Sequence, residues 1–296
     1  MVPDMTLARF TDTATSTATI STDTLAPPTG LAATGGSSVT LTWTPTVDTY
    51  ATGYTILRSA VSGGPYGAVG SVTPYSATTT TDAPAAGTWY YVLRSVFQSW
   101  TSVDSNQASA TVGTPTTTTI KSCTTNAADT IGAGDNNGYQ TNPARVCADD
   151  GSAANDSNSG TDTSTASCGT GATPNATKDR HRFWGYAFGL PATVSSISGI
   201  TVRADLGMNN NGGTTNLCVQ LSPDGGTSWT TIKSVPVSGT AQSIYTFGST
   251  TDSWGRTWTR NEFNTGNFRV RVIDASTRAN KQFRLDYVGV TVSYYP

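Results

Sequence analysis

Aspartates are the residues of this sequence that most evidently could bind a metal ion. The chain has 296 residues and 19 acidic side chains, of which only Glu262 is a glutamate. A polar stretch, 132–177, carries several aspartates, and carboxylate oxygens are the ligands that calcium prefers. The stretch offers Asp135, Asp149, Asp150, Asp156 and Asp162. Because Asp156, Asn158 and Gly160 break the EF-hand order, a solvated acidic loop without metal is an equal alternative.

No catalytic centre is predicted. His181 is the only histidine, and it lies between Arg180 and Arg182. A lone histidine needs a placed nucleophile or partner to act as a general base, and no G-x-S-x-G segment is present. Nothing singles out a pair of aspartates for glycosidic cleavage. We therefore expect a strand-edge histidine and a protein that is not an enzyme.

The segment SPDGGTSW, Ser222–Trp229, follows the pattern S-x-D-x-G-x-x-W. It resembles the Asp box of sialidases and many secreted β-proteins. Asp224 is expected to accept hydrogen bonds from the turn, Gly225 and Gly226 to supply positive φ angles, and Trp229 to pack over the loop. The motif predicts a structural hairpin turn.

Three tryptophans, Trp184, Trp254 and Trp258, are candidates for a flat platform that stacks against sugar rings. The last two are four residues apart in an expected loop, and the alternative is that they fill a sandwich core. The triplets NDS at Asn155 and NAT at Asn175 are candidate glycan acceptors.

Composition predicts an all-β protein. Threonine makes up about a fifth of the chain, and there are four lysines and one glutamate; β-branched and aromatic residues favour strands. The net charge of -2 gives no field for gathering nucleic acid. No apolar run approaches the roughly 20 residues that span a bilayer, so no transmembrane segment is expected.

The four cysteines predict two disulfides and an oxidising, extracellular location. No C-x-x-C pair is present, which disfavours a zinc site. Three pairings are possible, and we expect Cys147–Cys168 to close the polar stretch and Cys123–Cys218 to tie the second domain together. The N-terminal MVPDM lacks the features of a secretion signal, so the location is inferred from the cysteines.

Residues 27–113 alternate short strands with turns at the spacing of a β-sandwich. The pattern PPTGLAA…VTLTW…GYTILRS…GGPY…GTWYYVLRSV resembles fibronectin type III domains of bacterial secreted proteins. The resemblance implies that Trp43 lies in the core and that three side chains of a later strand point inward: Tyr91, Leu93 and Ser95. Trp89 stands where that family usually has a corner tyrosine.

Residues 114–122 are predicted to be a linker, and 123–296 a second sandwich with the polar, disulfide-containing insertion. The closing FRLDYVGVTVSYY resembles carbohydrate-binding jelly rolls. That resemblance implies a structural calcium ligated by Asp286. The alternative is an aspartate that hydrogen-bonds at the edge of the core.

The N-terminal segment, 1–26, is predicted to be an extended strand. Between Leu7 and Thr22 one face is apolar and the other is threonine-rich. The apolar face holds Ala8, Phe10, Ala14, Ala18 and Ile20. TLARFTDTATSTATISTDTL resembles the mature N-terminus of the TasA and camelysin family, which implies donation of this strand to the next subunit. The alternative is a strand that folds back onto its own molecule.

The sequence therefore predicts an N-terminal extended strand followed by two β-sandwiches, one fibronectin type III-like and one jelly-roll-like. The function we expect is that of a structural subunit of an extracellular, cell-surface filament, with copies of itself as partners. A secreted carbohydrate-binding or adhesive module, with polysaccharide or cell-surface glycans as partners, is the alternative. No cofactor is expected beyond a structural calcium.

Overall fold

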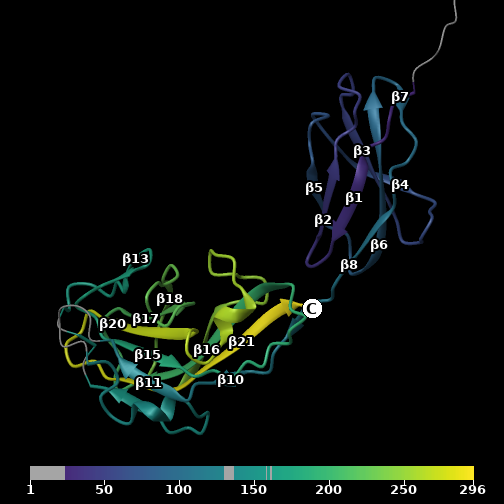
Figure 1. The fold of residues 1–296 in the computed structure, drawn as a ribbon. Coiled ribbons are helices and arrows are strands. Elements are labelled where there is room, and N and C mark those ends of the chain that lie inside the picture. The colour runs from purple at the N-terminus through teal and green to yellow at the C-terminus, as the bar shows by residue number, and fades with distance from the viewer. Residues whose placement is uncertain (1–23, 130–136, 158, 161) are drawn as a thin grey trace, which may run out of the picture.

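The computed structural model describes residues 24–129, 137–157, 159–160 and 162–296. They form an all-β protein with two sandwiches, whose strands are grouped in Figure 1 as β1–β8 and β10–β21. The predicted donor residues Ala8, Phe10, Ala14, Ala18 and Ile20 lie outside the described residues. In the described part of the chain, no helix is long and apolar enough to cross a membrane.

The first sandwich has two antiparallel sheets. One has the order β1–β2–β5, with strands Thr29–Thr34, Val39–Thr44 and Thr79–Asp82. The other has the order β4–β3–β6, with strands Gly67–Val72, Gly53–Ser59 and Gly87–Phe97, and β6 also pairs with β7 (Trp100–Thr101) and β8 (Ala108–Val112). Strand β2 alternates buried and exposed residues, as expected for a sheet with one face in a core.

The core of this sandwich forms around Trp43, whose ring meets Tyr54 edge-on with centroids 5.4 Å apart. Three inward residues of β6 predicted from the sequence are buried: Tyr91, Leu93 and Ser95. The indole Nε1 of Trp89 donates to the carbonyl of Ala85 at 2.8 Å. An indole N–H group thus makes a hydrogen bond to the backbone at the corner where that family usually has a tyrosine hydroxyl.

The second sandwich also has two antiparallel sheets. The first has the order β10–β21–β16–β19, with strands Lys121–Ser122, Phe283–Tyr295, Ser196–Met208 and Ser243–Gly248, and β21 also pairs with β9 (Thr116–Thr117) and β12 (Ala154–Asp156). The second has the order β11–β15–β20–β17–β18, with strands Thr125–Ala128, Arg180–Trp184, Arg269–Ser276, Thr215–Ser222 and Lys233–Pro236. A hairpin, β13 (Gly169–Thr170) and β14 (Thr173–Pro174), and two 3-10 turns, Pro143–Val146 and Arg260–Phe263, complete it.

The segment 114–122, expected to be a linker, contributes two short strands to this sandwich. Thr117 pairs with Ser293, and Ser122 pairs with Gly289, so the segment runs antiparallel along β21. The Thr117 and Ser293 hydroxyl groups also lie 2.7 Å apart. Such strands cannot be predicted from a threonine-rich sequence without apolar alternation, because they are held mainly by backbone pairing with β21.

Two disulfides form, but the predicted pairing is wrong. The bonds join Cys123 to Cys147 and Cys168 to Cys218. Cys123 follows β10, which pairs with Gly289 and Val290, and Cys147 bridges to Tyr287 two residues earlier on the same strand. Strand β21 therefore brings the first two cysteines together, whereas sequence proximity inside the polar stretch does not determine the partner.

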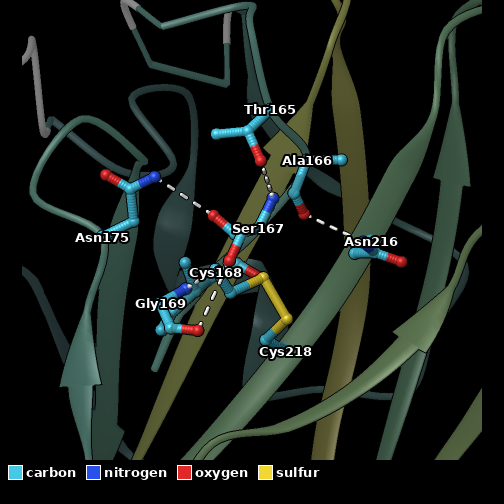
Figure 2. The surroundings of a disulfide bond; sticks show 9 residues. Thr165, Ala166, Ser167, Cys168, Gly169, Asn175, Asn216 and Cys218 are labelled. Atoms are coloured by element: carbon cyan, nitrogen blue, oxygen red, sulfur yellow. Dashed lines mark hydrogen bonds between the residues drawn. A yellow bond between two sulfur atoms is a disulfide. The ribbon is translucent and has the colours of Figure 1, made fainter. Parts of the chain in front are cut away.

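Cys218 lies on β17 and holds the loop that precedes β13 against the sheet, as Figure 2 shows. The same loop is fixed by Asn216, whose Nδ2 donates to the carbonyl of Ala166 at 2.9 Å. The end of the polar insertion is thus fastened to the five-stranded sheet by one covalent bond and one side-chain hydrogen bond.

Candidate functional site

The outer face of the five-stranded sheet gathers arginines and tryptophans. Residues directly opposite one another in an antiparallel pair point to the same face. Arg182 on β15 stands opposite Arg271 on β20, and Trp184 stands opposite Arg269. Phe183 and Val270 alternate with them and lie in the core. Together with Trp229, these residues form what we call the Arg–Trp face: Arg182, Trp184, Trp229, Arg269 and Arg271.

The guanidinium groups of this face stack on its indoles. The Arg269 guanidinium carbon lies 4.4 Å from the centre of the Trp184 ring, and that of Arg271 lies 3.7 Å from the centre of the Trp229 ring. Both tryptophans are half-buried. Stacking of this kind fixes the plane of the guanidinium group and leaves its edge available for hydrogen bonds.

The Asp box builds one border of the face and folds as predicted. Asp224 Oδ1 accepts the N–H groups of Thr227 at 3.1 Å and Ser228 at 2.9 Å. Gly225 and Gly226 have φ of 74° and 94°. The Trp229 indole donates to the carbonyl of Gly226 at 3.0 Å, which anchors the ring that stacks on Arg271.

Arg271 is the arginine of this face with an acidic partner. Its Nε lies 2.7 Å from Asp129 Oδ2, a distance suited to an ion pair although the N–H does not align as a hydrogen bond. Its Nη1 also donates to Gln220 at 3.0 Å. Burial lowers the pKa of Arg271 to about 10, and the charges of Arg180 and Arg182 act in the same direction against Asp129.

The candidate platform of three tryptophans does not form, because two of the three take the alternative position in the sandwich core. Trp254 and Trp258 are 4% and 3% exposed. Their indoles donate to the carbonyls of Ile200 and Ser253, each at 2.8 Å, and Trp258 packs among phenylalanines of the core. Of the three, Trp184 alone stays accessible, with Arg269 stacked on its ring. The sequence signal for the Arg–Trp face is the period of two in RHRFW and RVRV, in which basic residues alternate with apolar or aromatic ones.

Asp286 lies in a cluster of carboxylates on the outside of the other sheet. A β-bulge leaves Asp286 unpaired between Leu285 and Tyr287, opposite Leu206 and Asp205. Bulges redirect a side chain, and here carboxylate oxygens of Asp149, Asp205 and Asp286 lie within 4.8 Å of one another. Gln242 Nε2 donates to Asp286 Oδ2 at 2.8 Å.

This cluster fits a hard cation in part. Asp286 Oδ1 is buried without a hydrogen-bond partner, and an orphaned carboxylate oxygen is stabilised by a cation. Arg203, however, already pairs with Asp205 and lies 3.0 Å from Asp149. A calcium ligated by Asp286 therefore stays a prediction, and it would share two carboxylates with a guanidinium group.

A second acidic cluster was not predicted. Carboxylate oxygens of Asp156, Asp179 and Asp274 lie within 4.8 Å of one another, and all three residues are buried. Burial raises the pKa of the Tyr139 phenol well above its usual value, and the charge of Asp274 adds to the effect. These aspartates are separated by up to 118 positions, so only the fold brings them together.

Two of the four lysines are fully buried. Lys178 Nζ donates to the carbonyls of Asp162 and Ser276, the latter at 3.0 Å. Lys281 Nζ donates to the carbonyl of Asn210 at 2.7 Å. Both ammonium groups therefore replace water with backbone carbonyl oxygens.

His181 is not at the edge of its sheet. It lies on β15, between Ala128 of β11 and Val272 of β20, and is 2% exposed. Its Nδ1 accepts the N–H of Tyr139 at 3.2 Å, so the neutral ring places its proton on Nε2, which lies 3.0 Å from Asn126 Oδ1. The histidine is a neutral structural residue in this arrangement.

The candidate glycan acceptors lie in the polar insertion. Asn155 is in β12, where its backbone pairs with Arg284 of β21. Asn175 is half-buried, and its Nδ2 donates to the carbonyl of Ser167 at 3.2 Å, as drawn in Figure 2. Glycosylation at either residue stays a prediction.

Comparisons with known proteins found solved structures that are similar to this chain only to a limited extent. No protein-family model and no curated protein matches the chain. A structure of an Fn3-like protein from Clostridium thermocellum is 30% identical, with 31% of this chain and 97% of that chain covered and a TM-score of 0.28.

Two further structures align over most of the chain at low identity. The FN1–FN3 domains of chicken CNTN1 are 12% identical, with 88% of this chain and 69% of that chain covered and a TM-score of 0.29. Promiscuous carbohydrate-binding modules of the β-sandwich superfamily are 9% identical, with 86% and 92% covered and a TM-score of 0.23. At TM-scores below 0.5, none of these likenesses transfers a function to this chain.

Protonation of His181 should destabilise the protein in mild acid. Burial, with a smaller contribution from Arg182, lowers the pKa of His181 to about 4. The ordinary pKa of a histidine is about 6.5, so as the pH falls the unfolded chain binds the proton before the folded protein does. The free energy of unfolding therefore decreases by about 3 kcal/mol between pH ~6.5 and pH ~4. Unfolding free energies measured across this range should show a steeper decline for the wild type than for His181→Gln. Equal slopes would contradict a buried neutral histidine.

Calcium should stabilise the protein through Asp286. At calcium concentrations about 100-fold above the dissociation constant, binding to the native state alone adds about 2.7 kcal/mol. A chelator should therefore lower the melting temperature of the wild type but not of Asp286→Asn. Asp104→Asn, in the first sandwich, is the matched control and should respond as the wild type does. An unchanged melting temperature in excess chelator, together with no bound calcium by elemental analysis, would rule the site out.

Proposed function

We propose that this chain is a secreted, non-catalytic binding protein whose second sandwich holds a polysaccharide against the Arg–Trp face. The observation that carries the proposal is the pair of half-buried indoles, Trp184 and Trp229, each held by a stacked guanidinium group on one face of a sheet. Indole rings offer apolar area to the faces of sugar rings, and their fixed orientation reduces the entropy lost on binding.

The surroundings of these indoles support a sugar ligand over an apolar one. Exposed hydroxyl and amide side chains border the face on two loops, at Thr227, Ser228 and Asn267. The second loop is tied to the first by the N–H of Gly225, which donates to the carbonyl of Asn267 at 2.8 Å. Such groups exchange hydrogen bonds with sugar hydroxyls at a surface that stays in contact with water.

A non-catalytic role agrees with the positions of the acids. The cluster of Asp156, Asp179 and Asp274 is buried, and Asp205 is paired with Arg203. Glycosidic cleavage needs two carboxyl groups that reach the same sugar bond. Neither arrangement offers an accessible pair.

Binding should be detected by affinity electrophoresis of the intact protein in gels that contain polysaccharides. Trp184→Ala removes one stacking surface and should weaken binding about two- to tenfold. Trp100→Ala is the matched control, because Trp100 lies on β7 of the first sandwich and is 54% exposed. Absence of retardation by every polysaccharide tested would contradict the proposal.

A second candidate function is that of a filament subunit that receives a strand from its neighbour. Strand β4 pairs only with β3 within the described residues and is exposed along almost all of its length. Its sequence, GAVGSV, contains no charge and no proline, two features that protect an edge strand, although a bulge at Val69 interrupts its pairing with β3. Val69, 40% exposed, gives this edge an apolar contact.

If the predicted donor residues pair with β4, two single substitutions should prevent polymerisation. Val69→Lys places a charge on the acceptor edge, and Phe10→Asp places one on the apolar face of the donor. Negative-stain electron microscopy should reveal fibres of the wild type but folded, separate molecules of both variants and of a chain lacking residues 1–24. Val103→Lys, at a 73% exposed position away from β4, is the control and should polymerise. Fibres of the truncated chain would disprove donation.

A further inference from the structure

We propose that the ligand of the Arg–Trp face is an acidic polysaccharide, whose carboxylate or sulfate groups are bound by the guanidinium groups of Arg182 and Arg269. This inference rests on the proposed binding function and adds to it the charge of the ligand and the residues that recognise it. It follows from the charges, the hydrogen bonds and the accessibility of the face.

The face holds more positive charge than the surrounding acids neutralise. Three of its five side chains are arginines, and Arg182 and Arg271 stand directly opposite each other. Like charges in that position destabilise a sheet. Asp129 pairs with Arg271. Among the ion pairs of the described residues, none includes Arg182 or Arg269.

This local excess is opposite in sign to the charge of the whole chain, which is -2. Burial lowers the pKa of Arg269, and the neighbouring charge of Arg182 lowers it further. Both effects mean that the positive charge of Arg269 is held at a cost in free energy. A bound anion would offset that cost, because it supplies the opposite charge where desolvation has weakened the screening by water.

Arg182 and Arg269 also have hydrogen-bonding capacity to spare. The Nε atoms of both are buried and have no hydrogen-bond partner, so the donors that a ligand can use are the outer N–H groups of each guanidinium group. Among the described residues, the Arg182 guanidinium makes one long hydrogen bond, from Nη2 to the carbonyl of Ala128 at 3.5 Å. Both side chains are half-buried, so part of each remains in contact with solvent. A planar guanidinium fork matches a carboxylate or sulfate through paired N–H donors.

Arg271 has a different role from the other two arginines. Its N–H groups face Asp129 and Gln220, and its plane is covered by Trp229. It is a positioning residue that keeps Trp229 in place. The ligand oxyanions are therefore assigned to Arg182 and Arg269.

Sugar oxyanions suit this face better than nucleic acid. Binding of nucleic acid draws on many phosphate contacts, and a patch of three arginines is small beside the surface that such a ligand covers. A polysaccharide with one anionic group on a sugar ring combines an oxyanion for Arg182 or Arg269 with hydroxyls for the bordering loops. Trp184 then offers its remaining surface to the ring of the same sugar or of its neighbour.

The test compares three polymers with the full-length protein: polygalacturonate, dextran sulfate and neutral dextran. Affinity electrophoresis should show retardation by at least one of the two acidic polymers and little by dextran. Raising the salt concentration from about 0.05 M to about 0.5 M should weaken binding at least tenfold, because exposed charge pairs are screened. Polygalacturonate alone would identify carboxylate as the ligand group, dextran sulfate alone would identify sulfate, and both would mean that the face accepts either.

Arg182→Gln and Arg269→Gln should each weaken binding of the acidic polymer about tenfold, since each removes a charge-assisted hydrogen-bond donor. Arg284→Gln is the matched control: it makes the same change of charge at an exposed residue of β21, on the other sheet. It should bind as the wild type does. Thermal unfolding of each variant checks that the protein folds. The salt dependence is measured on the wild type and therefore does not depend on the folding of any variant.

The outcomes separate this inference from the function on which it rests. Salt-insensitive binding of neutral dextran, unchanged in both arginine variants but weakened in Trp184→Ala, would overturn the acidic ligand and leave the binding function standing. Binding of acidic polymers that falls equally in Arg284→Gln would also overturn the assignment to this face. No binding of any polymer would overturn both.

Discussion

The alternation of side chains along β20 is the constraint on which the second sandwich depends. Val270 and Val272 point into the core, and Arg269 and Arg271, which alternate with them, point to the opposite face. Because a strand presents successive residues to opposite faces, the same four residues seal the core and create the basic face. A slip of one residue in the pairing would bury two guanidinium groups and expose two valines, so packing and surface chemistry impose the same register.

Charged side chains are stabilised by different interactions on the two sheets of the second sandwich. On the outer face of the six-stranded sheet, Arg203 forms ion pairs with Asp149 and Asp205, two of the three carboxylates that gather at a bulge in β21. On the Arg–Trp face, Asp129 pairs with Arg271, and stacking on indoles holds the guanidinium groups of Arg269 and Arg271. Stacking satisfies the flat faces of a guanidinium group but not its N–H edge.

Local patterns predicted much of the fold. The alternation in VTLTW and in the closing strand, together with the turn chemistry of the Asp box, depends on residues that are neighbours in sequence, and the structure has these elements. Contacts between distant residues were beyond such reasoning. The partner of Cys147 is set by its bridge to Tyr287, and the strands in 114–122 are held by the backbone of β21.

The candidate site was predicted only in part for the same reason. Trp184 was singled out together with Trp254 and Trp258 as a candidate platform, and the last two instead face the core, which was the alternative. The stacking of Arg271 on Trp229 joins a central strand to a hairpin turn about forty residues away, and no period in either segment reveals it. Asp286 was singled out by resemblance, whereas its neighbours Asp149 and Asp205 come from a loop and from another strand.

The burial of Lys178 and Lys281 makes the folded protein selective toward amine-directed reagents. Of its four lysines, only Lys121 and Lys233 keep accessible surface, and the Arg–Trp face contains none. Acylating dyes, biotin esters and activated resins therefore react with lysines at two places outside the proposed binding surface. Immobilisation through these amines presents the arginines and indoles chemically unaltered.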